Sequence, residues 1–204
     1  PLGAGQFTYH LADEEARINV NTAPPDRLDR LLRALGLEKS ERDTIVSSIP
    51  DWRDANDDHR LNGAESDDTY LKLPVPYRAR NGNLESTSEL LQIKGVTPAI
   101  FKGTDGRLGL ADLLTVGTPG QVNLNTAGLL VLRTLGLADS EISEIEQARR
   151  SAPYTVVPGR FAGRGLSVTT KTFKVEAEGL IGGQVRARLT AVVQRRVEGN
   201  LATV

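Results

Sequence analysis

Apolar residues recur with a helical period through the middle of the chain and with a strand period at both ends. The two clearest helical patterns lie in residues 18–49 and 122–150, and these stretches resemble each other. Each starts with apolar residues alternating with asparagine, continues with Thr-Ala and an amphipathic helix, and passes through Leu-Gly-Leu into a second helix. The first helix is about one turn shorter in the second copy, which keeps its apolar face in register. The pattern predicts an internal repeat of helical hairpins.

Residues at the borders of these patterns predict where the helices begin and end. Thr22 and Thr126 precede the first helix of each copy. Ser40 and Ser140 precede the second helix, so we expect all four hydroxyls to cap helices. The glycine of each Leu-Gly-Leu turn suits the position after a helix C-terminus, where a left-handed backbone is common. A third helical hairpin is predicted at residues 84–101, where a serine and a glutamate three positions apart form a capping box.

The C-terminal part of the chain has the period of a β-strand. Within residues 168–194, two runs of alternating apolar and polar residues flank a Gly-Gly pair. They predict an antiparallel hairpin with one buried face. A register with Ala177 opposite Ala187 would pair Glu178 with Arg186 on the solvated face.

Strand-like segments also occur near the start, where residues 7–11 and 17–20 predict a second short hairpin. The fold class is therefore expected to be α+β, with strands from both chain ends forming a sheet and a large helical domain inserted between them. The expected division is a sheet part, 1–20 and 155–204, and a helical domain, 21–154, that contains the acidic loop 51–68.

Composition limits what the core and the site can be made of. The chain has 204 residues, 39% of them hydrophobic and only 4% aromatic, so leucine, valine, isoleucine and alanine must form the core. No apolar run reaches the ~18 residues of a membrane span. The absence of cysteine excludes disulfides, thiolate catalysis and cysteine-ligated zinc. The opening letters PLGAG and the absence of methionine indicate an expression scar followed by a truncated protein.

One non-periodic segment concentrates negative charge, although the net charge of the chain is only −1. Two arginines, Arg53 and Arg60, lie within it. Its seven acids are Asp51, Asp54, Asp57, Asp58, Glu65, Asp67 and Asp68. A charged, solvated surface loop is the simplest interpretation. The apolar flanks at Trp52 and 70–73 instead indicate a segment that is packed down, and carboxylates packed together need a cation.

The spacing within this segment matches a twelve-residue calcium loop counted from Asp54. Positions one, three, five, seven, nine and twelve are Asp54, Asn56, Asp58, Arg60, Asn62 and Glu65. Arg60 would contribute its backbone carbonyl, and Glu65 would close the shell with two oxygens. Asp51, Asp67 and Asp68 supply further oxygens, so one or two Ca²⁺ ions are expected. His59 replaces the usual glycine, and nearby prolines exclude a helix-loop-helix. Magnesium and zinc suit this ligand set less well.

Four motifs in this order resemble the minor pseudopilin K family of type II secretion systems. They are D-W-x-D at 51–54, G-A-E at 63–65, P-Y-R-x-x-N at 76–81, and S-E-L followed by G-V-T-P at 88–98. The resemblance covers almost the whole chain. Asn56 stands where the family usually has aspartate, which lowers the expected charge of the site.

The resemblance implies a structural protein and not an enzyme. It implies a pilin-like fold with a helical insertion that binds calcium through Asp51, Asp54, Asn56, Asp58, Glu65 and Asp68. It also implies a periplasmic domain anchored in the inner membrane by an N-terminal helix. The expected partners are the minor pseudopilins I and J, with which the family caps the pseudopilus tip. No nucleic acid and no small-molecule substrate are expected.

Two other functions compete with this one. The helical hairpins also resemble helix-hairpin-helix nucleic-acid-binding modules, but their turns at 35–37, 94–96 and 135–137 lack the second glycine. A net charge of −1 also disfavours DNA. An enzyme would need a catalytic motif or a carboxylate held near neutral, and the acidic loop is expected to be too polar for that.

Overall fold

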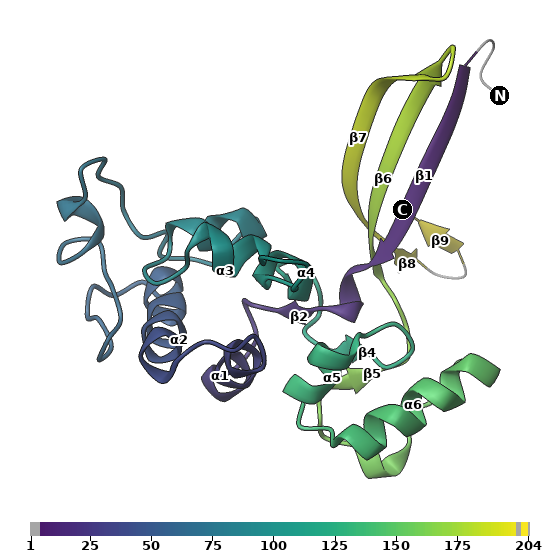
Figure 1. Cartoon of the computed structure of the whole chain (residues 1–204), viewed down its shortest axis with the longest axis horizontal. Coiled ribbons are helices and arrows are strands. Elements are labelled where there is room, and N and C mark those ends of the chain that lie inside the picture. Colours follow the sequence, from purple (N-terminus) through teal and green to yellow (C-terminus); the bar gives the residue numbers. More distant parts are fainter. Residues whose placement is uncertain (1–4, 199–200, 204) are drawn as a thin grey trace.

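A three-stranded antiparallel sheet projects from a helical body in the computed structural model, which describes residues 5–198 and 201–203 (Figure 1). The strands are β1 (Gly5–Asp13), β6 (Thr172–Ile181) and β7 (Gln184–Gln194), in the order β1-β6-β7. The first strand therefore pairs with a strand more than 150 residues later, as expected for a sheet built from both chain ends. The expectation of an α+β protein is confirmed.

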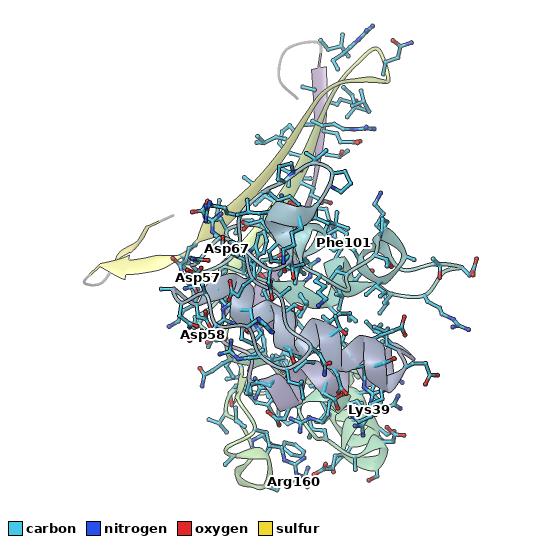
Figure 2. All side chains as sticks on the ribbon, turned by 90° about the vertical axis from the view of Figure 1, so that its left-hand side faces the viewer. Lys39, Asp57, Asp58, Asp67, Phe101 and Arg160 are labelled. Carbon is cyan, nitrogen blue, oxygen red and sulfur yellow. The ribbon has the colours of Figure 1, made fainter. Side chains whose placement is uncertain are left out.

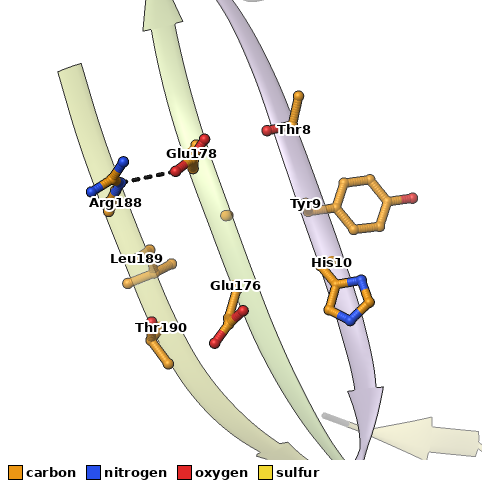
Figure 3. A pocket seen from close by; sticks show the side chains of 9 residues that line it. Thr8, Tyr9, His10, Glu176, Glu178, Arg188, Leu189 and Thr190 are labelled. Atoms are coloured by element: carbon orange, nitrogen blue, oxygen red, sulfur yellow. Dashed lines mark hydrogen bonds and ion pairs between the residues drawn. The ribbon is translucent and has the colours of Figure 1, made fainter. Parts of the chain in front are cut away.

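The register of the β6–β7 hairpin differs from the predicted one by two residues. Ala177 lies opposite Leu189, and Glu178 lies opposite Arg188. Arg188 Nε donates to Glu178 Oε1 over 2.8 Å on the open face of the sheet (Figure 3). The prediction assumed a three-residue loop. The actual turn has two residues, both glycines with positive φ, and a bulge beside Gly179 adds the second shift.

The predicted N-terminal hairpin is wrong. Residues 7–11 pair with β6, whereas β2 (Ile18–Asn19) runs parallel to β3 (Leu114–Thr115) in the helical body. A short 3₁₀ turn, Glu14–Ala16, separates β1 from β2 and turns the chain out of the sheet. The two segments therefore belong to different parts of the fold, and local alternation alone could not show this.

Asp13, at the end of β1, joins the sheet to the second helical hairpin. Its Oδ2 accepts hydrogen bonds from Asn123 Nδ2 at 2.9 Å, Thr126 Oγ1 at 2.5 Å and Thr170 Oγ1 at 2.7 Å. These donors come from residues 110 to 157 positions away. One carboxylate therefore fixes the end of the sheet against this part of the helical body.

The next two acids make equivalent connections elsewhere. Glu14 accepts from Thr115 Oγ1 at 2.6 Å, beside β3. Glu15 accepts from the backbone N–H groups of Lys171 and Thr172, at 3.2 and 2.9 Å, at the start of β6. Both glutamates are buried. Three consecutive acids thus bind the second hairpin, the strand β3 that pairs with the first hairpin, and the sheet.

The helical body contains the predicted repeat. Helices α1 (Pro25–Ala34) and α2 (Lys39–Arg53) form the first copy, and α5 (Leu129–Thr134) and α6 (Asp139–Ser151) form the second. Each copy begins with a two-residue strand that has a parallel partner: β2 pairs with β3, and β4 (Val122–Asn123) pairs with β5 (Leu166–Ser167). Helix α1 packs against both α2 and α5.

The asparagine after β2 closes the first copy. Asn21 Oδ1 accepts from the backbone N–H of Leu84 at 2.9 Å. Its Nδ2 donates to the carbonyls of Leu84 at 2.9 Å and Val116 at 3.1 Å. One side chain therefore satisfies three backbone groups from segments 63 and 95 residues away.

Asn125 does the same in the second copy. It accepts from the N–H of Tyr154 at 2.7 Å and donates to the carbonyls of Tyr154 and Val168 at 3.0 and 3.3 Å. The two copies thus share hydrogen-bond geometry as well as sequence pattern. The first copy is much longer because it carries the acidic segment between its second helix and the residues that its asparagine binds.

The predicted threonine and serine caps are wrong. The N-cap residues are Pro24, Glu38, Gly128 and Ala138. The second helix of each copy is capped instead by a glutamate that reaches back, Glu41 to the N–H of Glu38 and Glu141 to that of Ala138. The hydroxyl of Thr126 donates to Asp13 instead of capping the helix. The glycines after the first helices do have the predicted left-handed backbone, with φ of +84° at Gly36 and +82° at Gly136.

The third predicted hairpin is present as two short helices. A 3₁₀ helix, Thr87–Gln92, starts at the predicted capping box of Ser86 and Glu89 and is followed by α3 (Pro98–Lys102). The remaining elements are α4 (Leu110–Leu113), β8 (Arg196–Glu198), β9 (Leu201–Thr203) and 3₁₀ turns at Tyr70–Lys72 and Gly159–Phe161.

The core lies in the helical body and consists mainly of leucine, isoleucine and valine. The predicted sheet part, 1–20 and 155–204, includes β5, which pairs with β4 of the predicted helical domain, 21–154. No helix in the described ranges 5–198 and 201–203 is long and apolar enough to cross a membrane.

Candidate metal centre

Most of the acidic loop lies in a longer segment, residues 54–81, that leaves the end of α2 and returns to it; we call this segment the excursion. It begins where α2 ends at Arg53. Its return is marked by a hydrogen bond from the N–H of Asn81 to the carbonyl of Trp52, at 3.0 Å. The excursion lies at the end of the helical body remote from α5 and α6 (Figure 1). Figure 2 shows Asp57, Asp58 and Asp67 close together at one side of the molecule.

An aromatic cluster packs the excursion down. The ring of Trp52 meets that of Tyr70 edge-on, with 5.2 Å between the ring centroids. Tyr70 stacks on Tyr77, with 5.3 Å between the centroids. Trp52 and Tyr70 are buried. The hydroxyl of Tyr77 also donates to the carbonyl of Gln92 at 2.7 Å. The prediction that the flanks of the loop are packed is confirmed at Trp52 and Tyr70, whereas residues 71–73 are exposed.

Asp51 is the centre of the acidic group. It lies in the last turn of α2, and its side chain is fully buried. Its Oδ2 accepts from the backbone N–H groups of Arg60 and Ala64, both at 3.0 Å. Gly63 passes so close that a Cβ there would stand 1.8 Å from the same oxygen. The loop is therefore wrapped around this carboxylate, and any side chain at 63 would displace it.

The guanidinium of Arg60 supplies the positive charge. Its Nη1 contacts Asp51 Oδ1 at 2.5 Å and Asp54 Oδ2 at 2.7 Å. Both hydrogen bonds raise the pKa of Arg60, and the one to Asp54 has the larger effect. Arg60 was expected to contribute only its carbonyl, which here accepts from the N–H of Gly63 at 2.8 Å. Sequence spacing did not reveal the contact made by its side chain.

Glu65 is buried beside this pair without a counter-charge. Its side chain is about 1% exposed, and neither carboxylate oxygen has a hydrogen-bond partner among the described residues. Burial raises its pKa to about 7, and the charges of Asp51 and Asp54 add to the shift. The expectation that this loop is too polar to hold a carboxylate near neutral is therefore wrong. Burial also keeps Glu65 out of reach of a substrate.

The other predicted ligands are more exposed and make local contacts. Asn56 Oδ1 accepts from the N–H of Asp58 at 2.9 Å. Asp67 lies 3.8 Å from Arg78. Asp68 pairs with His59 Nδ1 at 2.8 Å and accepts from the backbone N–H of Glu65 at 3.0 Å. Asp68 therefore contacts the backbone of the buried Glu65 and is itself half-buried, whereas Asn56, Asp58 and Asp67 remain at the surface.

Asp51, Asp54 and Glu65 fit a hard divalent cation by their chemistry. All of their donors are oxygens, and both Glu65 oxygens and Asp54 Oδ1 are buried without a partner in the described part of the chain. Nevertheless, across residues 5–198 and 201–203, three or more acidic or histidine side chains do not converge into a closed metal site. Asp51 and Asp54 are close enough to Glu65 to raise its pKa, but the three carboxylates are not gathered around one point.

Residues 9–104 match the protein family described as "Type II secretion system (T2SS), protein K". These residues, just under half of the chain, therefore carry a domain of this family. The chain is 24% identical over 97% of its length to the type II secretion system protein K of Pseudomonas aeruginosa, covering 63% of that protein. It is 32% identical over 50% of its length to that of Pectobacterium carotovorum, covering 35%. The chain thus spans between about a third and two thirds of these relatives.

A solved structure shares the fold of this chain over the full length of the chain. The match is to a chain in the crystal structure of the GspK-GspI-GspJ complex from enterotoxigenic Escherichia coli, with a TM-score of 0.76 and 20% identity. It covers 100% of this chain and 79% of the other. The matched family is a component of a secretion system, so the match over residues 9–104 favours the first predicted function over the helix-hairpin-helix alternative.

Proposed function

We propose that this chain is the periplasmic part of a structural minor pseudopilin of a type II secretion system. The full-length fold match to a chain of the GspK-GspI-GspJ complex supports this proposal most directly. The partners would be the minor pseudopilins I and J of the same system, and together they would cap the pseudopilus tip. An N-terminal helix of the full-length protein would anchor it in the inner membrane. No catalytic step is proposed, because Glu65, the one carboxyl among the described residues whose pKa is raised to near neutral, is buried.

Complex formation tests this role. Mixing the chain with the soluble domains of pseudopilins I and J from the same system should give a single peak of equimolar stoichiometry in size-exclusion chromatography with light scattering. The domains of I and J mixed without this chain provide the control, because light scattering should then give a smaller mass for the eluting species. Three separate monomer peaks at concentrations of about 10 μM would contradict the assignment.

We further propose that Ca²⁺ binds in the acidic loop, with Asp51, Asp54 and Glu65 as its innermost ligands. The partnerless, buried Glu65 carboxylate is the observation that supports this most strongly. Ca²⁺ accepts six to eight oxygens, and backbone carbonyls and waters can complete its shell. Asp68, Asn56, Asp58 and Asp67 are candidates for the outer positions and for a second ion. Binding would neutralise the carboxylates and fasten the excursion to α2.

Calcium should therefore raise the thermal stability of the purified protein. Ca²⁺ at 100 times its dissociation constant would add about 2.7 kcal/mol to the free energy of unfolding, because only the folded state holds the site together. Thermal unfolding in EDTA, in millimolar Ca²⁺ and in millimolar Mg²⁺ measures this, and Mg²⁺ should have the smaller effect.

Glu65→Gln provides the matched control for this experiment. The amide keeps the shape of the side chain but removes a charge that is costly to bury. We expect the variant to unfold in EDTA at or above the wild-type temperature and to gain little stability from Ca²⁺. An equal Ca²⁺ response in both proteins, or none in the wild type, would exclude Glu65 from a calcium site.

A further inference from the structure

The contacts of Arg60 suggest a role beyond the proposed ligand set. Its guanidinium reaches Asp51 and Asp54, and among the ion pairs of the described residues no other cation contacts either carboxylate. The third acid, Glu65, receives no contact from it. One built-in positive charge thus offsets two of three clustered negative charges. The position it occupies lies between carboxylates that a divalent cation would also need.

The two sides of this ion pair are held very differently. Asp51 is fixed in a helix and fully buried, and the N–H of Ala64 holds its Oδ2 independently of any arginine side chain. The side chain of Arg60 is 48% exposed and belongs to the excursion. Its backbone N–H also binds Asp51, so the loop stays attached when the guanidinium moves away. The guanidinium can therefore leave into solvent while Asp51 keeps its position.

We propose that Arg60 is a tethered cation that holds Asp51 and Asp54 together in the metal-free protein and is displaced from them by Ca²⁺. This inference rests on the proposed calcium site. Because displacement costs the ion pairs, the apparent affinity for Ca²⁺ is lower than the carboxylates alone would give. In return, the loop keeps its packing when the ion is absent. The residue thereby sets the Ca²⁺ concentration at which the site fills.

Removing the guanidinium should lower the stability of the metal-free protein but raise its affinity for Ca²⁺. In Arg60→Gln, the unfolding temperature in EDTA should fall, because Asp51 loses its partner. The dissociation constant for Ca²⁺, measured by isothermal titration calorimetry, should decrease by about 10-fold, the change that corresponds to losing an opposing 1.4 kcal/mol. A residue with a merely structural role would lower both stability and affinity.

Two further variants separate charge from shape. Arg78→Gln removes another arginine of the excursion, one that lies 3.8 Å from exposed Asp67. This variant should keep the unfolding temperature of wild type in EDTA, and its dissociation constant for Ca²⁺ should stay within about twofold of the wild-type value. Arg60→Lys keeps a positive charge without the forked geometry and should bind Ca²⁺ with an affinity between those of wild type and Arg60→Gln. If Arg60→Gln does not fold, the Arg60→Lys measurement still tests the idea.

The outcomes distinguish this inference from the calcium proposal. Equal or weaker Ca²⁺ binding by Arg60→Gln and Arg60→Lys, with clear binding by wild type, would overturn the role of Arg60 and leave the calcium site intact. The absence of Ca²⁺ binding in wild type and in every variant would overturn the calcium site itself. Tighter binding by both variants, and unchanged binding by Arg78→Gln, would support the tethered cation.

Discussion

Asp51→Ala is expected to lower the free energy of unfolding by about 3–5 kcal/mol, even without metal, because it removes the fully buried acceptor of two backbone N–H groups, each costing about 1–3 kcal/mol when left unpaired. The backbone N–H groups of Arg60 and Ala64 would lose their acceptor, and the guanidinium would keep only Asp54. The space beside Gly63 would also be left partly empty. Urea denaturation in EDTA measures the loss without any contribution from calcium.

Asp57→Ala provides the control for this prediction. Asp57 carries the same charge and lies in the excursion, but it is exposed. Its replacement should change stability by no more than about 0.5 kcal/mol, as is usual for surface substitutions. A loss below about 1 kcal/mol for Asp51→Ala would mean that the loop does not wrap around this carboxylate in solution.

Asn21→Ala and Asn125→Ala should each cost about 2–3 kcal/mol, because each leaves an N–H and two carbonyls without a partner inside the helical body. The two side chains share no hydrogen-bond partner. The double variant should therefore lose the sum of the two single losses within about 0.5 kcal/mol. Chemical denaturation of the four proteins gives the comparison.

Asn83→Ala is the control here, since Asn83 is exposed and lies next to a residue that Asn21 binds. It should be nearly neutral. If Asn21→Ala were as mild as Asn83→Ala while Asn125→Ala were severe, the two copies would not depend on the same closure. The repeat would then be similar in sequence without a shared source of stability.

The repeat was predictable because its evidence is local. Apolar spacing and the glycine after each first helix are set by residues within one or two turns, and the left-handed φ at Gly36 and Gly136 confirms them. The contacts that precede the first helix of each copy were not predictable for the opposite reason. Asn21 and Asn125 bind residues between 29 and 95 positions away, and these contacts organise the start of each copy in a way that no local rule describes.

The candidate site shows the same division. The acids were found by their concentration, and the burial of Trp52 and Tyr70 follows from their apolar character. Counting from Asp54, however, made Asp51 an accessory residue, whereas the structure places it at the centre. The sequence signal for this was Gly63, which is needed because of its close approach to Asp51. The contact of the Arg60 side chain depends on how the loop folds back over α2, and spacing carries no information about that.

The three consecutive acids at the end of β1 have a mechanical consequence. Asp13 holds the start of the second hairpin, Glu14 holds β3, which pairs with β2 at the start of the first hairpin, and Glu15 holds the start of β6. A force applied along the sheet therefore reaches both helical hairpins in parallel and is shared between them. A single covalent link would instead load one hairpin before the other. Because the joint spans only three residues, it has little lever arm, and the sheet and the helical body should tilt together as one stiff unit when either is pushed.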